Sequence, residues 1–337
     1  MRQSLGVSNT PGLGPVPARS LAGGVAGMVL VGSSVAVSRV LVAAPLCTAQ
    51  AIRYGIAALL LLALARLLHI PIAAPRGREW LWLAGIAVVG LVIFNLAIVH
   101  GAAHAQPTMI AVAVACVPVL LGVLGPMLQG QRPRRQVILA AVIVTVGAAT
   151  VEGAGHADLL GIGYAALTLA CEAGFTLLAV PLLERHGAWG VSLHSVWLGA
   201  VMFAMLGIVT EGPAAATRLT TPDLLATGYL ALLVTVAAFI LWYSAVAVLG
   251  PDRAGLITGI APVSAALVGI ATGSRAPTLL MWAGIAVVMG GLAAGLMNRR
   301  QPAAPGRYPA GGMAVLGGHG PAGRILDESS IRTVHFT

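Results

Sequence analysis

Apolar residues dominate this chain in ten long stretches, which are separated by short segments with more polar residues, Gly and Pro. An α-helix needs about 20 mostly apolar residues to cross the hydrocarbon core of a bilayer. Lipid offers the backbone no hydrogen-bond partner, so each stretch that crosses must be helical. The pattern therefore predicts ten transmembrane helices, near residues 22–42, 46–67, 80–100, 107–127, 136–153, 160–183, 190–210, 224–247, 254–272 and 279–298.

Prolines and glycines recur along the chain at a constant separation of 144 residues. Such internal repetition is typical of transporters built from duplicated bundles. Each copy holds five helices, and because five is odd, the second copy must cross the membrane in the opposite direction to the first. The sequence thus predicts an all-α polytopic membrane protein with two inverted five-helix repeats, at residues 21–153 and 158–298. The repeated landmarks are the pairs Pro107 and Pro251, Pro118 and Pro262, Pro133 and Pro277, and Gly147 and Gly291.

The arginines predict how these helices are oriented. All 19 basic residues of the chain are arginine, and most lie in the segments between hydrophobic stretches. Cytoplasmic loops of membrane proteins carry the excess of basic residues. Placing both termini in the cytoplasm leaves only Arg218 and Arg275 in outer loops, so we expect that orientation. We also expect disordered cytoplasmic tails at residues 1–20 and 299–337, which have no sustained apolar period.

Composition and motifs exclude several function classes. The chain is 58% hydrophobic and 9% charged, whereas about a quarter of the residues of a soluble domain are charged. The net charge of +9 does not indicate nucleic-acid binding, because the arginines are not gathered on one face. Cys47, Cys116 and Cys171 lack the spacing of a disulfide framework or zinc site, and no third ligand stands near His100 and His104. With no nucleotide-binding or hydrolase motif either, we expect neither an enzyme nor a cofactor nor a metal.

Three segments carry a resemblance to a known family. They are AIRYGIAALLLLAL, which contains Arg53 and Tyr54, the stretch from Phe94 to Leu120, and the stretch from Phe239 to Gly269. Together with the ten helices and the repeat, over roughly residues 21–298, the chain resembles the EamA-type members of the drug/metabolite transporter superfamily. The resemblance implies a bundle in the plasma membrane (the inner membrane of a bacterium) with a cavity between helices one to four and six to nine. It also implies transport of amino acids or other small metabolites.

Glu172 is the only acidic residue deep inside a predicted helix. A carboxylate at the bilayer centre costs roughly 3 kcal/mol, so it must face a cavity, find a partner or hold a proton. This position predicts a proton-coupling group, and the alternative is a neutral or salt-bridged residue that only packs.

Arg53 lies roughly 10 Å below the outer end of the second helix, at 1.5 Å per residue. It can bind a substrate carboxylate or pair with Glu172. The alternative is an arginine that extends to the outer headgroups.

Other residues within the predicted helices extend the candidate site. Pro118 and Pro262 each remove a backbone donor and open their helix, which predicts paired hinges, or else kinks that only shape packing. Polar and aromatic groups nearby predict the lining of a substrate cavity, with helix packing as the alternative. These candidates are Tyr54, Asn95, Ser33, Ser34, Trp242 and Tyr243.

We therefore expect a secondary active transporter that exports small metabolites or amino acids by alternating access and is coupled to protons through Glu172. An uncoupled facilitator or exchanger explains the scarcity of ionisable groups equally well, and a membrane sensor or intramembrane enzyme is a third class. The expected partners are a small-molecule substrate, the lipid bilayer and protons, with no nucleic acid. Glycine-rich helix faces such as 290–295 also allow a homodimer.

Overall fold

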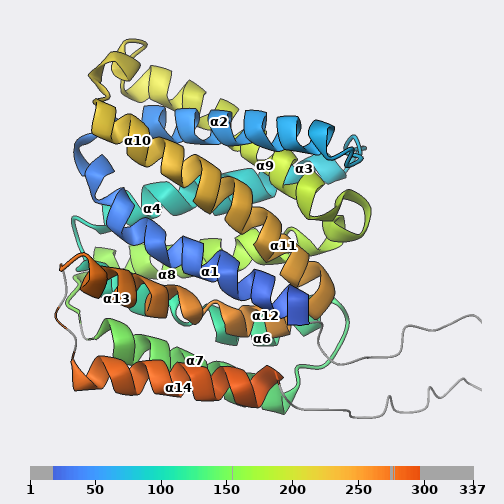
Figure 1. Ribbon diagram of the computed structural model, residues 1–337, viewed down its shortest axis with the longest axis vertical. Helices are drawn as coiled ribbons and strands as arrows, with labels where there is room; N and C mark the ends of the chain where they lie inside the picture. Colours follow the sequence, from blue (N-terminus) through green and yellow to red (C-terminus); the bar gives the residue numbers. More distant parts are fainter. Residues whose placement is uncertain (1–17, 154, 274–275, 277, 297–337) are drawn as a thin grey trace, which may run out of the picture. The chain divides into compact units, whose positions relative to one another are not determined.

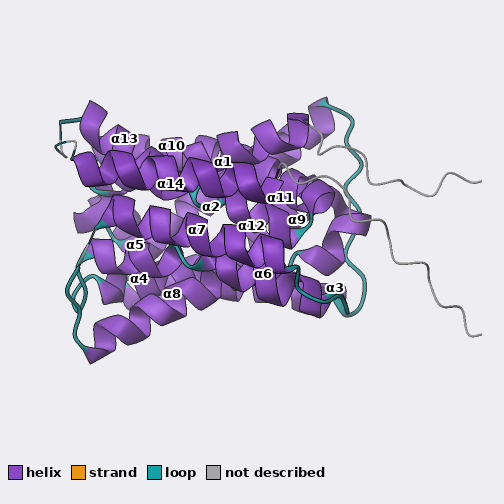
Figure 2. Cartoon of the chain, turned by 90° about the horizontal axis from the view of Figure 1, so that it is seen from below, coloured by secondary structure: helices purple, strands orange, loops and turns teal. Residues whose placement is uncertain are grey.

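A computed structural model describes residues 18–153, 155–273, 276 and 278–296. The expected tails, apart from residues 18–20, and Arg275 lie outside the described residues. Helices account for the regular structure of the described part, which contains no β-strand, and ten of its helical segments are long and apolar enough to cross a membrane. The prediction of an all-α bundle of ten transmembrane helices is thereby confirmed. In Figure 2 the helices run side by side, with the loops at the two ends.

Six of the ten transmembrane segments are single elements, one of them kinked, and four are composite. The single elements are α1 (Ala18–Ser38), α2 (Leu46–Leu67), α7 (Arg135–Glu152), α8 (Leu159–Leu177), α9 (Val180–Thr210), which is kinked at Gly187, and α14 (Leu279–Leu296). The composite segments are α3 (Glu79–Gly85) with η2 (Ile86–Ile93) and α4 (Phe94–Gly101); α5 (Pro107–Val114) with α6 (Val117–Leu128); α10 (Thr221–Tyr229) with η4 (Leu230–Ala237) and α11 (Ala238–Leu249); and α12 (Pro251–Ile257) with α13 (Ile260–Ala271). Two short 3₁₀ turns, η1 (Val40–Ala43) and η3 (Ala215–Arg218), lie in loops.

Several boundaries differ from the sequence prediction, most of all the start of the seventh segment, which is Val180 rather than residue 190. The first helix begins at Ala18, inside the segment expected to be a tail. The sixth helix ends at Leu177, whereas the hydrophobic pattern extended it to residue 183. Pro181 is the reason, because proline is tolerated in the first turn of a helix and disrupts its interior. It therefore opens α9, which then bends at Gly187, where φ is +60°.

Each repeat contains one wide π-helical segment at the same place. These segments are η2 and η4, and each residue of η4 lies 144 positions after its counterpart in η2. Backbone hydrogen bonds in a π-helix span one residue more than in an α-helix, and such segments are rare and are frequently found at functional sites. In η4 the Thr235 hydroxyl donates to the Leu230 carbonyl at 3.0 Å, five residues back. Nothing in the apolar sequence pattern predicts these segments.

The fourth and ninth transmembrane segments are both broken just before a proline. The breaks lie at residues 115–116 and 258–259, ahead of Pro118 and Pro262. The prolines cannot supply the donors that would continue the helices. Thr145 of α7 instead donates its hydroxyl to the Ala115 carbonyl at 3.0 Å. The prolines thus open their helices as predicted, while their action as hinges stays a prediction.

Helices α7 and α14 pack against each other along one edge of the bundle, at the bottom of Figure 1. A Cβ atom placed on Gly147 would lie 2.7 Å from the backbone nitrogen of Val288, and one on Gly291 would lie 3.0 Å from that of Val144. Val288 lies 144 residues after Val144, and Gly291 lies 144 after Gly147. The interface therefore makes the same valine-on-glycine contact twice, as a pseudo-twofold axis between inverted repeats requires.

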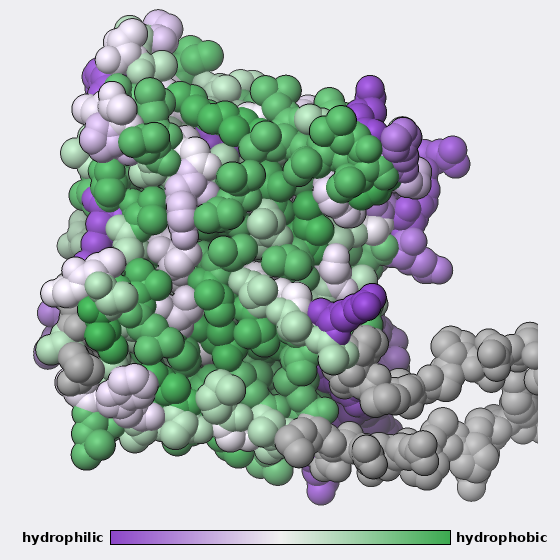
Figure 3. All heavy atoms as spheres, viewed as in Figure 1, coloured by the Kyte–Doolittle hydropathy of each residue, from purple (hydrophilic) through white to green (hydrophobic). Residues whose placement is uncertain are grey.

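The surface of the bundle is apolar, as Figure 3 shows for one face. Large side chains such as Leu59, Leu139 and Val209 are more than half exposed. In water this surface would drive aggregation, but in lipid it is the expected exterior. The largest fully buried side chains include Tyr54, Tyr243 and Phe203, so these three aromatic residues lie inside, whereas Trp80, Trp82 and Trp282 are exposed.

Candidate functional site

A hydrogen-bonded network surrounds Arg53 on α2. Its Nε donates to the Thr235 hydroxyl of η4 at 2.9 Å, and its Nη1 donates to Gln50 Oε1 at 3.3 Å. The guanidinium carbon lies 5.1 Å from the centre of the Tyr54 ring, within the range of a cation–π contact. Arg53 makes no ion pair with any described acidic residue. A guanidinium has five donors, so this half-buried group keeps several for a ligand.

Asn95 extends the same network to the third transmembrane segment. Its carbonyl oxygen accepts from Gln50 Nε2 at 2.9 Å, and its amide donates to the Leu91 carbonyl at 2.7 Å and to the Tyr54 hydroxyl at 3.2 Å. Asn95 is the second residue of α4, two positions after the end of η2, and Thr235 belongs to η4, so the network includes residues in or close to both π segments. The structure thus brings together three predicted residues, Arg53, Tyr54 and Asn95.

Gln50 and Thr235 complete the network and were missed by sequence reasoning. Both are buried, at 8% and 0% exposure. Gln50 had a usable signal, because it stands one helical turn before Arg53 in an otherwise apolar stretch. Thr235 had none, because an isolated threonine in a transmembrane helix usually bonds only to its own backbone.

Glu172 lies on α8, apart from this network. It makes no hydrogen bond or ion pair with another described residue, so the pairing with Arg53 that the sequence allowed is absent from this conformation. One turn further along, Tyr243 donates to the Phe175 carbonyl and Trp242 Nε1 donates to the Thr176 hydroxyl, both at 3.2 Å. The predicted aromatic residues thus join α11 to α8 beside Glu172.

Trp242 and Tyr243 are buried at 3% and 0% exposure, so they reach a ligand only if the helices move. Of the two predicted serines on α1, Ser33 exchanges a 2.8 Å hydrogen bond with the Tyr229 hydroxyl, whereas Ser34 donates to its own backbone at Val31. Ser33 therefore links α1 to α10, while Ser34 contributes only a local bond.

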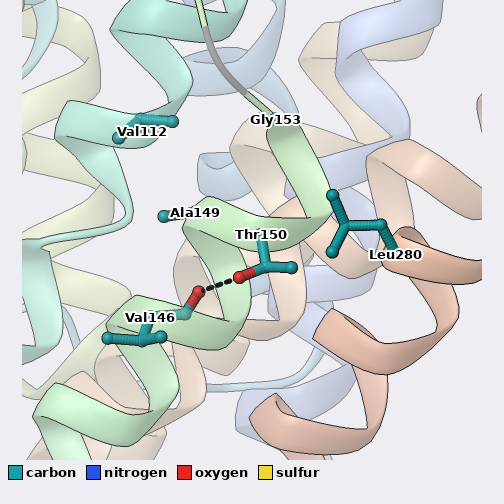
Figure 4. Close-up of a pocket in the computed structure, with 6 residues that line it drawn as sticks. All are labelled: Val112, Val146, Ala149, Thr150, Gly153 and Leu280. Atoms are coloured by element: carbon teal, nitrogen blue, oxygen red, sulfur yellow. Dashed lines mark hydrogen bonds between the residues drawn. The ribbon is translucent and has the colours of Figure 1, made fainter.

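The described part of the bundle includes two recesses of several hundred cubic ångströms. The first holds about 430 Å³ and is lined by Val112, Val146, Ala149, Thr150, Gly153 and Leu280 (Figure 4). Its single side-chain hydroxyl, that of Thr150, is already bonded to the Val146 carbonyl. With no charged group and no predicted site residue in its wall, this recess has the character of a lipid contact. The second, of about 360 Å³, lies between α2, α9 and the loop after α2.

The α2–α9 pair is clamped by Glu211 at the end where α2 begins. Its carboxylate accepts from the amides of Cys47 and Thr48, at 2.7 and 2.9 Å, and so caps the start of α2. Partial burial raises the pKa of Glu211, but hydrogen bonds from Thr48 and Cys47 outweigh it and hold the pKa below its ordinary value. The carboxylate is thus the favoured form at this helix N-terminus.

At the opposite end of the pair, α9 holds the loop that follows α2. Arg185 donates to the Ala74 carbonyl at 3.0 Å and pairs with Glu79, while His194 Nε2 donates to the Ala73 carbonyl at 3.0 Å. His186 Nε2 lies 3.2 Å from the same Glu79 carboxylate. These contacts fix the loop against α9.

The two histidines near the C-terminal end of α4 contact other side chains. His100 and His104 both stack on Tyr164, and His104 Nδ1 lies 2.9 Å from the Asp158 carboxylate. Asp158 also accepts from the Gly161 amide, and these two bonds lower its pKa. No group of three or more His, Cys, Asp or Glu residues converges within the described part of the chain.

Three comparisons relate this chain to known proteins. A model of the EamA-like transporter family matches the chain twice, at residues 19–152 and 159–296. An "Uncharacterized transporter YetK" of Bacillus subtilis (strain 168) is 27% identical over 293 residues, which are 85% of this chain and 88% of that protein. A solved structure described as "Crystal structure of protein" superposes with a TM-score of 0.71 at 18% identity, over 84% of this chain and 98% of the other. That last similarity concerns the fold alone.

Proposed function

Because the chain belongs to the EamA-like transporter family, we propose that it is a secondary transporter that exports small metabolites or amino acids by alternating access. It has no enzymatic role in this proposal. The membrane is the plasma membrane, and both termini lie in the cytoplasm, an orientation supported by the excess of arginine in the loops on that side. The working partners are a small-molecule substrate, the surrounding bilayer and protons, and a homodimer remains open to test by cross-linking.

The observation that carries this proposal is the network around Arg53. A half-buried guanidinium with free donors is a ready site for a carboxylate, since arginine binds carboxylates through two parallel bonds. Its bonds to Gln50 in the first repeat and Thr235 in the second place it between the two halves that must move relative to each other. A ligand that binds Arg53 therefore acts on a residue that is bonded to both repeats.

Glu172 is the proton-coupling group of the proposal. It lies within α8 with no hydrogen-bond or ion-pair partner among the described residues, and an acid in that position is a functional candidate by default. Protonation removes its charge, which lowers the cost of moving it through the low-dielectric interior. The alternative function is an uncoupled facilitator or exchanger, in which Glu172 only packs.

The test begins with the cargo. Comparison of the medium of cells that express the chain with that of control cells identifies exported metabolites, and proteoliposomes then measure transport of the compound found. We expect Glu172→Gln to abolish transport driven by a pH gradient, whereas Glu184→Gln, at an exposed position on α9, leaves it unchanged. Arg53→Gln should raise KM by roughly tenfold or more, the value of a charged hydrogen bond.

The outcomes separate the alternatives. A full pH response in the Glu172→Gln variant would remove the coupling role, and counterflow that ignores the pH gradient would select the facilitator. Binding of cargo without any transport would favour a sensor. The orientation is tested with a reporter enzyme that is active only outside the cytoplasm, fused to the C-terminus. Activity of that reporter would overturn the proposed orientation.

A further inference from the structure

The recess between α2 and α9 is a built pocket rather than an accidental gap. Its walls come from the last turns of α2, from the loop over residues 70–75 and from α9 at Leu193 and His194. The loop is fixed by the bonds of Arg185 and His194 to the carbonyls of Ala74 and Ala73. The loop backbone that shapes the pocket is therefore held by two side chains of α9.

The lining of this α2–α9 pocket is apolar with one free cation at its rim. Leu62, Ile70, Ile72 and Leu193 supply most of the wall. His194 is not available to a ligand, because Nε2 donates to Ala73 and Nδ1 accepts from Trp197 at 3.4 Å. Arg66 is the one arginine in the lining, is exposed, and makes no side-chain hydrogen bond or ion pair with another described residue. The pocket thus offers an apolar interior beside an uncompensated guanidinium.

The pocket also reaches the lipid-facing side of α2. Leu62, which lines it, is 38% exposed, and its neighbours on the same helix, Leu59 and Leu67, are 69% and 72% exposed. Figure 3 shows hydrophilic side chains gathered at the end of the bundle where α2 ends and α3 begins, next to the hydrophobic surface. A molecule in this pocket would therefore lie at the boundary between hydrocarbon and headgroups.

From this combination we propose that the α2–α9 pocket binds an anionic phospholipid, with its phosphate on Arg66 and part of one acyl chain against Leu62, Ile72 and Leu193. Arginine pairs bidentately with phosphate oxygens, and basic pockets between transmembrane helices are suited to lipid headgroups. The volume of about 360 Å³ holds a segment of acyl chain and not a whole lipid. This site is separate from the proposed transport site around Arg53.

The test measures lipid retention by native mass spectrometry on the purified full-length protein. The delipidated protein is titrated with phosphatidylglycerol or with phosphatidylcholine of the same acyl chains. We expect one phosphatidylglycerol molecule to be retained preferentially, and Arg66→Gln to weaken that binding by about tenfold, as for the loss of a charged hydrogen bond. Arg135→Gln is the matched control, since Arg135 is an exposed arginine at the start of α7, outside the pocket.

A second variant tests the pocket itself. Ala74→Phe fills the space from the loop while the backbone carbonyl that Arg185 binds is kept, and it should abolish retention with Arg66 intact. Retention by Ala74→Phe, or equal loss in Arg66→Gln and Arg135→Gln, would mean that charge alone attracts the lipid and would overturn the proposal. Displacement of the lipid by millimolar inorganic phosphate would assign the site to a soluble anion instead.

Discussion

The two repeats share a scaffold and differ in their polar chemistry. In both, a π segment interrupts the third helix of the repeat and a proline breaks the fourth. The first repeat then carries Arg53 and Gln50, whereas residues 144 positions later are Trp197 and His194. Conversely, Thr235 of the second repeat corresponds to Leu91 of the first. Duplication thus preserved the parts that bend, while the groups that can recognise a charge occur once.

A similar contrast explains an otherwise puzzling hydroxyl. Thr48 gives its hydroxyl to Glu211 at 2.7 Å. Its counterpart 144 residues later, Ser192, is fully buried and its hydroxyl has no partner among the described residues. Glu211 in turn corresponds to Leu67 in the first repeat, so the acceptor is missing at the second site. The clamp is therefore a specialisation of one end rather than part of the shared scaffold.

The largest expected effect tests the shared scaffold. Gly147→Ala and Gly291→Ala should each lower the free energy of unfolding by roughly 1–3 kcal/mol, because the new methyl group meets backbone atoms that cannot move aside cheaply. Thermal unfolding in detergent measures both. Gly290→Ala is the control, since a Cβ there meets no atom within 4 Å. A large loss at one of the pair with none at the other would contradict the twofold equivalence of the contact.

The next effect concerns the polar network, which is not duplicated. Thr235→Val keeps the shape of the side chain and removes the acceptor for Arg53, so we expect a loss of about 1–2 kcal/mol in stability. Thr235→Ser restores the hydroxyl and should recover most of that loss. The thermal unfolding midpoints of the two variants and of the parent protein measure this difference in stability. Equal stability of Thr235→Val and the parent protein would show that the Arg53 bond contributes nothing.

The smallest effect concerns the clamp at the start of α2. Glu211→Gln should cost about 1 kcal/mol, the usual value of a helix cap, and less at high salt. Because the pKa of Glu211 is lower in the folded protein, its contribution is complete above the ordinary value of about 4.5 and is lost as the pH falls through the folded value. Unfolding measured between pH 7 and pH 3 should therefore show that acid lowers the stability of the variant less than that of the parent protein. An identical pH profile would contradict the role of the carboxylate.

The architecture was predictable from the sequence because its cause is local. Hydrophobic length fixes where helices cross, and the recurrence of Pro118 as Pro262 reveals the duplication without any knowledge of contacts. The end of α8 was misplaced because Leu177 to Leu183 is continuously apolar, and only Pro181 within it marks the true boundary. Hydropathy does not distinguish one helix from two that follow each other closely.

The candidate site was predictable only in part. Arg53 and Asn95 stood out as polar residues in apolar helices, and the structure joins them. Their connection runs through Gln50, and the anchor of Arg53 is Thr235, 182 residues away in sequence. Such a contact depends on how two repeats pack and on a π segment that turns the threonine toward α2. Neither leaves a periodic signal in the chain.

The valine-on-glycine contact between α7 and α14 has one more consequence. A contact made twice about a twofold axis is the contact that two identical separate subunits make when each presents the same face to the other. At this edge the protein therefore behaves as an antiparallel dimer whose subunits happen to be joined by the short connection between residues 153 and 158. The linker raises the effective concentration of α7 and α14 for each other, and the complementary shapes of their two faces then stabilise the contact.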